Sequence, residues 1–196
     1  MYLAWAWAYL RGWGNPERIG AGFGAIARRH RPLHDQQERR STVEGRLVTT
    51  IWPSTLRVAA LDAQTGRLHA FEATEGHLLA DAVSASGAVP GISPAVELGG
   101  RLWIDGGMVS SANARLAAGY DRVLVLAPLP TSYGGVPSVS EDVAALREHA
   151  RVDLAVPDRA SRAAIGANIY DATRRAASAD AGRHQGLRAA DAIDWR

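Results

Sequence analysis

Residues 81–107 read DAVSASGAVPGISPAVELGGRLWIDGG, and this stretch says most about the fold. Apolar residues in its first part recur at helical spacing and continue upstream, which predicts a helix over Glu75–Ala88. Thr74 is in position to cap that helix, and Gly87 followed by Pro90-Gly91 is typical of a helix end. The first part of the stretch therefore predicts a helix that stops just before a turn.

The second part of the stretch is typical of a β-hairpin. Val96–Leu98 and Arg101–Ile104 flank Gly99-Gly100, a dipeptide that favours the positive φ angles of a two-residue turn. The second arm leads directly to Asp105, which we therefore expect at the mouth of a strand.

Asp105 is the residue whose setting best suits chemistry. Gly106 and Gly107 follow it, so the backbone can bend sharply and a substrate or another loop can approach. A carboxylate held in this place, short of full solvation, could accept a proton from a neighbouring hydroxyl group. Asp-Gly is also a common turn pair in which Asp bonds its own backbone, and the residues alone leave this alternative open.

The sequence upstream of the quoted stretch predicts helices and a second hairpin. Leu56–Leu61 and Leu68–Glu72 are strand candidates, and Gly66 suits the tight turn between them, so we expect antiparallel pairing. Helices are expected before them, over Ile19–His30 and over Asp35–Glu44.

The sequence downstream predicts a βαβ unit. Arg122–Ala127 is an almost continuous apolar run, typical of a parallel strand covered on both faces. Ser140 can cap a helix that runs to Ala150, and Val152–Val156 is a further buried strand. The remaining expected elements are a short helix over Asn113–Gly119 and a largely helical tail over Ala160–Ala192, interrupted near Gly166 and Gly182. Together the elements predict an α/β fold with a parallel sheet and antiparallel hairpins at one side.

Length and composition fit one globular domain. The chain has 196 residues, of which 47% are hydrophobic and 21% charged, enough to bury a core. It has no cysteine, which excludes disulfides, thiolate metal sites and a cysteine nucleophile. The lack of cysteine also fits a reducing compartment, so we expect a cytoplasmic location.

Charge and the remaining motifs argue against nucleic-acid binding, a histidine metal site and a membrane span. The net charge is only +2, and the basic residues, all arginine, do not gather in one stripe, so nucleic-acid binding is not expected. His30 and His34 have the spacing of metal ligands on a helix, but Pro32 between them argues against that face. Met1–Leu10 is apolar and aromatic but shorter than the ~20 residues of a membrane span, so we expect a buried or interfacial helix.

The stretch from Asp81 to Gly107 resembles the patatin-like phospholipase family. In that family a helix reading A-x-x-A-S-x-A-x-P-G precedes a short hairpin that ends in D-G-G or D-G-A. Both patterns occur here, the first over residues 82–91 and the second at residues 105–107. The resemblance covers most of the chain from about Ile19 to Ala164.

The resemblance implies a serine acyl hydrolase with a serine–aspartate dyad in which Asp105 is the general base. The other site residues that it implies are Gly106, Gly107, Ser86, Pro90 and Gly91. The family's serine lies in a G-x-S-x-G elbow after a Gly-rich oxyanion loop, and both precede the segments found here. Residues 1–196 contain neither motif, so no residue of this chain is assigned as nucleophile, and we expect it to be inactive by itself.

The fold implied by the resemblance is α/β, a three-layer patatin-like arrangement with a mainly parallel central sheet and antiparallel hairpins. Residues 1–196 would form the carboxyl-terminal portion of a single domain whose amino-terminal part is missing. The implied substrate is a lipid or other acyl ester, with no metal or organic cofactor. Peripheral membrane contact would suit such a substrate, and the oligomeric state stays open.

The sequence leaves three interpretations open. The chain is a form of an active hydrolase that begins downstream of its serine, which is the interpretation we favour. Alternatively, it is a non-catalytic descendant that binds an acyl ligand or a protein, or a small interaction domain whose D-G-G similarity is accidental.

Overall fold

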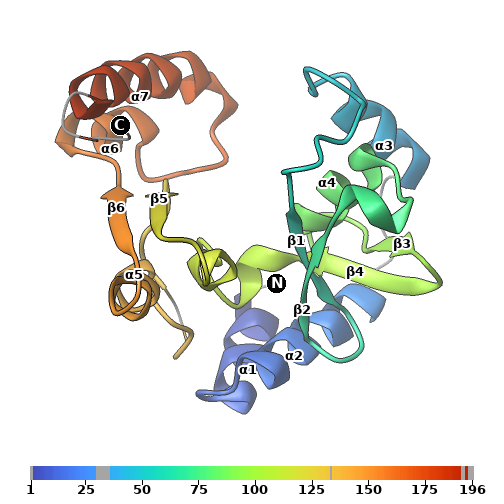
Figure 1. Cartoon of the computed structure of the whole chain (residues 1–196). Helices are drawn as coiled ribbons and strands as arrows, with labels where there is room; N and C mark the ends of the chain where they lie inside the picture. The colour runs from blue at the N-terminus through green and yellow to red at the C-terminus, as the bar shows by residue number, and fades with distance from the viewer. Residues whose placement is uncertain (1, 30–35, 133, 191–192, 194–196) are drawn as a thin grey trace.

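The computed structural model of the chain describes residues 2–29, 36–132, 134–190 and 193 (Figure 1). It has an α/β fold, as the sequence predicts, with an antiparallel sheet in one half of the molecule and a parallel pair of strands in the other. The chain crosses between the halves in the segment that follows Asp105.

The larger sheet is antiparallel and has the strand order β2-β1-β4-β3. Its strands are β1 (Val58–Asp62), β2 (Leu68–Phe71), β3 (Val96–Leu98) and β4 (Arg101–Asp105). Both expected hairpins are confirmed: Gly66 has a φ of 73° in the first turn, and Gly99 and Gly100 have φ of 58° and 72° in the second. Asp105 is the last residue of β4 and lies opposite Ala60 of β1.

The smaller sheet is the predicted βαβ unit. β5 (Arg122–Leu126) pairs in parallel with β6 (Arg151–Ala155), and α5 (Val139–Arg147) connects them. Its strands are not covered on both faces, however: Leu126 of β5 is 68% exposed, and in β6 only Val152 is buried.

In the part of the chain that the structure describes, parallel pairing is limited to β5 and β6 and an isolated bridge between Pro90 and Ser93, and a mainly parallel central sheet is not formed. Antiparallel pairs dominate because short turns join β1 to β2 and β3 to β4, whereas parallel neighbours need a long crossover.

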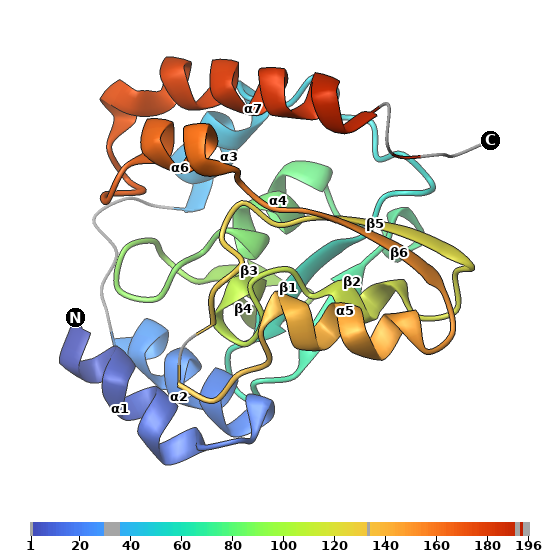
Figure 2. The same cartoon turned by 90° about the vertical axis from the view of Figure 1, so that its left-hand side faces the viewer.

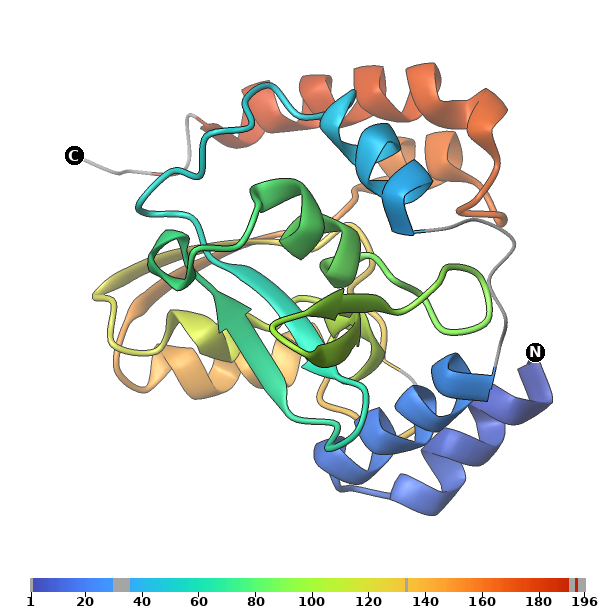
Figure 3. The same cartoon turned by 90° about the vertical axis from the view of Figure 1, so that its right-hand side faces the viewer.

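Helices cover both faces of the larger sheet. They are α1 (Tyr2–Gly12), α2 (Pro16–Arg29), α3 (Gln36–Glu44) and α4 (Leu79–Ser86). Figure 3 shows α1 and α2 below the sheet and α3 and α4 above it. In the other half, α6 (Arg159–Ile165) and α7 (Arg175–Ala190) lie side by side beyond the carboxyl ends of β5 and β6 (Figure 2).

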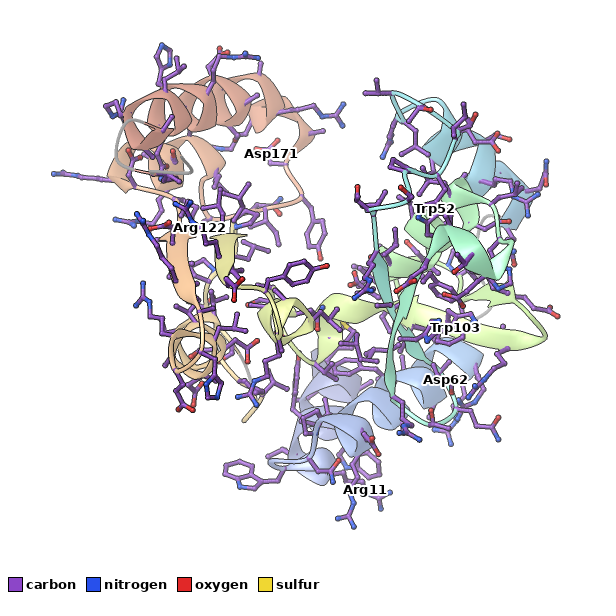
Figure 4. All side chains as sticks on the ribbon, in the orientation of Figure 1. Arg11, Trp52, Asp62, Trp103, Arg122 and Asp171 are labelled. Carbon is purple, nitrogen blue, oxygen red and sulfur yellow. The ribbon has the colours of Figure 1, made fainter. Side chains whose placement is uncertain are left out.

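Alternation along β4 sends neighbouring side chains into two separate cores. Trp103 packs edge to face on Phe71, with 4.7 Å between the ring centroids, in the core beneath α4 (Figure 4). The next residue, Ile104, packs with Leu61 and with Phe23 of α2 on the opposite face. Because a slip of one residue would exchange these faces, the register of β4 is fixed, and the position of Asp105 with it.

The helix predicted over Glu75–Ala88 begins later than expected. A 3-10 turn covers Ala73–Glu75, Gly76 adopts a φ of 76°, and α4 begins only at Leu79. The left-handed conformation of Gly76 cannot continue a helix, so the two elements are separate. Thr74 lies inside the 3-10 turn, and its prediction as N-cap is wrong.

Two other helix boundaries also differ from the prediction. Ser138 caps α5 in place of Ser140: its hydroxyl oxygen accepts a hydrogen bond from the Glu141 amide at 3.2 Å, and the Glu141 carboxylate accepts one from the Ser138 amide at 2.6 Å. In the tail, Gly166 does interrupt the helix, with a φ of 74°, whereas Gly182 lies inside the unbroken α7.

Glycines let α2 lie directly against the turn between β1 and β2. A Cβ atom at Gly24 would be 1.7 Å from the Ala63 carbonyl oxygen, and one at Gly20 would be 2.6 Å from the Gly66 carbonyl oxygen. Both obstacles are backbone atoms, which cannot move aside as the end of a flexible side chain can.

We expect Gly24→Ala to lower the free energy of unfolding by about 3 kcal/mol, because the new methyl group forces α2 away from the sheet. Gly182→Ala is the matched control in α7, where no atom lies within 4 Å of the new Cβ, and it should raise the free energy of unfolding by up to about 1 kcal/mol through helix propensity. Urea unfolding measures both. Equal effects of the two changes would contradict the close approach of α2.

Candidate active site

Asp105 is the last residue of β4, and hydrogen bonds hold both its backbone amide and its carboxylate. Its amide donates a hydrogen bond to the Ala88 carbonyl at 3.1 Å, just beyond the end of α4. Its carboxylate accepts a hydrogen bond from the Gly107 amide at 2.7 Å and so caps the 3-10 turn Gly106–Met108. The turn role considered for this aspartate is therefore real, and it leaves the second carboxylate oxygen without a hydrogen-bond donor among the described residues.

The half-buried Asp105 side chain lines a cavity of about 570 Å³. Ser86 and Gly107 line the same cavity, together with Asn113 and with Arg57, whose guanidinium is paired to Glu72 at 2.7 Å. The half-buried carboxylate therefore lies on the wall of an open cavity, where a bound molecule could reach it.

The opposite wall of this cavity is the edge of β5. Four consecutive residues, Val123 to Leu126, line it. Consecutive residues of a strand point to opposite faces, so a wall made by all four runs along the edge of the strand. In the described residues this edge has no strand partner, because β6 occupies the other side, and Leu126 is 68% exposed.

Burial raises the pKa of the Asp105 carboxyl above its ordinary value of 3.8. The Gly107 amide and the positive charge of Arg39 act in the opposite direction and limit the rise. The site therefore makes this carboxylate a stronger base than an exposed aspartate.

Arg39 connects α3 to the end of α4. Its Nε and Nη2 donate hydrogen bonds to the Ser84 carbonyl at 3.2 and 3.1 Å, and Nη2 also donates to the Gly87 carbonyl at 2.7 Å. Nη1 donates to the Ser93 hydroxyl at 3.0 Å. These carbonyls belong to the last turn of α4, which lacks intrahelical donors, so Arg39 caps the helix end that holds the Asp105 amide.

The residues implied by the resemblance divide into two groups. Ser86 and Gly107 share the cavity with Asp105, whereas Pro90, Gly91 and Gly106 do not line it. Pro90 is buried and its carbonyl accepts a hydrogen bond from Trp5 Nε1 at 3.0 Å, and Gly91 has a φ of 86° in the turn that follows α4. A Cβ at Gly106 would lie 2.9 Å from the Ala59 carbonyl oxygen, so this glycine allows the turn to sit against β1.

Asn113 belongs to the site but was not singled out from the sequence as a site residue. It lines the cavity, and its Nδ2 donates a hydrogen bond to the Gly106 carbonyl at 3.2 Å. It is the only non-glycine residue with positive φ, 48°, among the described residues, and it precedes the 3-10 turn Ala114–Ala117, where a helix over 113–119 was expected. Asparagine tolerates this conformation, which is the signal in the sequence that could have indicated it.

Ser111 is a further polar residue in the cavity wall. Its buried Oγ has no hydrogen-bond partner among the described residues. Its neighbour Ser110 faces the other way: the Ser110 hydroxyl donates to the buried Asp142 of α5 at 3.1 Å, and Arg115 Nε donates to the same carboxylate at 2.7 Å.

No group of three or more potential metal ligands occurs within residues 2–29, 36–132, 134–190 and 193. His30 and His34, the candidate pair considered from the sequence, lie outside the described residues. None of the helices that the structure describes is both long and apolar enough to span a membrane.

We expect Arg39→Gln to raise the pKa of Asp105 further, because the variant removes the cation that opposes the effect of burial. A carbon-13 NMR titration of aspartate carboxyl groups measures this, with Asp105→Asn to assign the signal. Arg46→Gln is the matched control: Arg46 is an exposed cation near Arg39 without a hydrogen bond to α4 among the described residues, and it should leave the Asp105 signal nearly unchanged. An unchanged or lower pKa in Arg39→Gln would exclude the proposed charge effect.

Asp105→Asn should also increase the free energy of unfolding at neutral pH. Since the folded-state pKa of Asp105 is raised, its contribution to stability is complete below the unfolded value near 3.8 and is lost as the pH rises through the folded value. Asparagine removes this loss, so the difference between variant and original chain should vanish at acid pH. Chemical unfolding at several pH values tests the sign.

Comparison with known sequences identifies a family for most of the chain that forms this site. The sequence profile described as patatin-like phospholipase matches residues 4–118, from α1 to the 3-10 turn after Asn113, and includes Asp105 and every cavity residue of the larger sheet. No curated protein matches the chain. A match over more than half of the chain excludes an accidental D-G-G sequence. The chain belongs to the patatin-like phospholipase family.

Proposed function

We propose that this chain carries the general-base half of a serine–aspartate acyl hydrolase that acts on lipid acyl esters. Asp105 is the base, and a serine in a segment outside residues 1–196 is the nucleophile. The observation that carries the proposal is the half-buried Asp105 carboxylate on the cavity wall, with one oxygen held by Gly107 and no donor to the other among the described residues.

The free carboxylate oxygen is suited to one chemical step. As the serine oxygen attacks the ester carbonyl carbon, its proton passes to Asp105, and the negative charge develops on the former carbonyl oxygen. The protonated Asp105 then returns the proton to the alcohol that leaves. Water releases the acyl group from the serine in the same way, with Asp105 again taking the proton.

We propose that the serine segment lies along the edge of β5 that has no strand partner among the described residues. A strand added along this edge would form one wall of the cavity, directly across from Asp105. Such an addition would also satisfy the backbone groups of β5 and cover Leu126. It would connect both sheets into the three-layer domain that the family resemblance implies, with residues 1–196 as its carboxyl-terminal portion.

A second candidate function is a non-catalytic module that binds an acyl ligand or a protein. The absence of G-x-S-x-G from residues 1–196 favours it, as does the aliphatic wall that β5 gives the cavity. Under either proposal we expect a cytoplasmic protein, because the sequence has no cysteine, and one that needs no cofactor and binds no nucleic acid. Peripheral contact with a membrane would bring it to a lipid substrate.

The test begins with the coding DNA upstream of Met1. An in-frame G-x-S-x-G within roughly one hundred codons would give a domain of about 250–300 residues. We expect that longer form to hydrolyse a short acyl ester and the chain of residues 1–196 to be inactive. Stop codons in every frame would favour the binding module.

In the longer form, Asp105→Asn should lower kcat at least about 100-fold, since general-base catalysis contributes that much or more. Asp180→Asn, on the exposed face of α7, is the matched control and should leave kcat unchanged. Turnover by Asp105→Asn at the original rate would exclude Asp105 as the base. Hydrolysis by residues 1–196 alone would exclude an external serine.

A further inference from the structure

We propose that the outer face of α1 and α2 is a docking surface for the anionic surface of a phospholipid bilayer. This inference goes beyond the proposed hydrolysis and does not depend on it, because it concerns a face built from different residues than the cavity at Asp105.

The first observation is an exposed apolar face on an anchored helix. Leu3, Trp7 and Leu10 recur at intervals of four and three along α1 and are 89%, 55% and 62% exposed. The other side of α1 is fixed to the fold: the rings of Trp5 and Tyr9 both pack edge-on against Phe23 of α2. The exposed face is therefore presented by a helix that is held in place.

The second observation is a groove that both apolar and basic side chains of α1 and α2 line. The groove has a volume of about 810 Å³. Leu3, Trp7 and Ile26 line it together with small residues of both helices, and Arg11, Arg18 and Arg29 stand around it. The arrangement combines apolar surface with positive charge, which is typical of segments that lie in a membrane interface.

The positive charge on this face is not neutralised within the described part of the chain. Arg11, Arg18 and Arg29 are exposed and have no ion pair to a described residue. α1 contains no acidic residue, and the acid near the start of α2, Glu17, pairs with Arg67 at 3.5 Å. A partner with negative charge is therefore the one that complements this face.

Trp7 and Arg11 favour a bilayer as the partner of this face. The Arg11 guanidinium lies 3.8 Å from the centre of the Trp7 ring, and Figure 4 shows Arg11 at the outer end of the molecule, directed away from both sheets. Tryptophan favours the headgroup level of a bilayer, where its ring meets both apolar and polar surroundings. Arginine binds phosphate groups there with two parallel hydrogen bonds. Trp13, just after α1, is a further exposed tryptophan, with 75% of its surface accessible.

The experiment is sedimentation of the chain of residues 1–196 with lipid vesicles. Vesicles of phosphatidylcholine alone are compared with vesicles of phosphatidylcholine and phosphatidylserine in equal amounts, and sedimentation without vesicles is subtracted. We expect at least about tenfold tighter binding to the anionic vesicles, weakened by added salt.

Two double variants test the surface. Trp7→Ser with Arg11→Ser should reduce binding to anionic vesicles at least about tenfold. Arg183→Ser with Leu187→Ser is the matched control, because it removes one arginine and one large apolar side chain from the exposed face of α7, and it should bind as the original chain does.

Three outcomes would overturn the proposal: equal binding to neutral and anionic vesicles, no binding to either, or equal losses in both double variants. Light scattering can give a fourth outcome that would overturn the proposal. A dimer that Trp7→Ser alone converts to a monomer would assign the face to a second copy of the chain. None of these measurements involves ester hydrolysis, so their failure is separate from a failure of the proposed activity.

Discussion

The site depends on the hydrogen bond that joins the end of β4 to the end of α4. The Asp105 amide donates to the Ala88 carbonyl, so the strand can place its carboxylate only where the helix ends. The buried contacts of Trp103 and Ile104 fix the register of the strand, and Arg39 fixes the helix end by binding its last carbonyls. Asp105 is thus positioned by three elements that are distant in sequence, and its location does not rely on a flexible loop.

This arrangement keeps a carboxylate in a place that is unfavourable for its charge. Burial raises the pKa of Asp105, and a single amide donor does not satisfy both of its oxygens. The surroundings nevertheless leave the chain little freedom to turn the side chain away. Gly106 lies against the Ala59 carbonyl, and the Asn113 amide holds the Gly106 carbonyl in the same turn. Conflicts of this kind are expected where a group serves chemistry more than stability.

The sequence predicted those features that depend on local chemistry. The Gly99-Gly100 turn needs only two residues that accept positive φ, and the apolar run of β5 needs only its composition, so both could be read directly. Arg39 could not be found in this way, because it acts on Ser84, 45 positions away, through a contact that only the packing of α3 on α4 creates. Gly182 was expected to break a helix, but its cost is only about 1 kcal/mol, which the rest of α7 tolerates.

The width of the cavity follows from how the two halves are joined. Each half has its own core, although Val136, between β5 and α5, packs into a core of the larger sheet. Among the described residues no strand pairing connects the halves. The segment after Asp105 crosses the space, and the buried Asp142 of α5 holds it there by accepting hydrogen bonds from Ser110 and Arg115. The buried Asp142 carboxylate needs both donors, because either one alone would leave one of its oxygens without a hydrogen bond. Asp142 belongs to the half that does not carry the base, and it holds the segment that leaves Asp105, so α5 connects the two sides of the site.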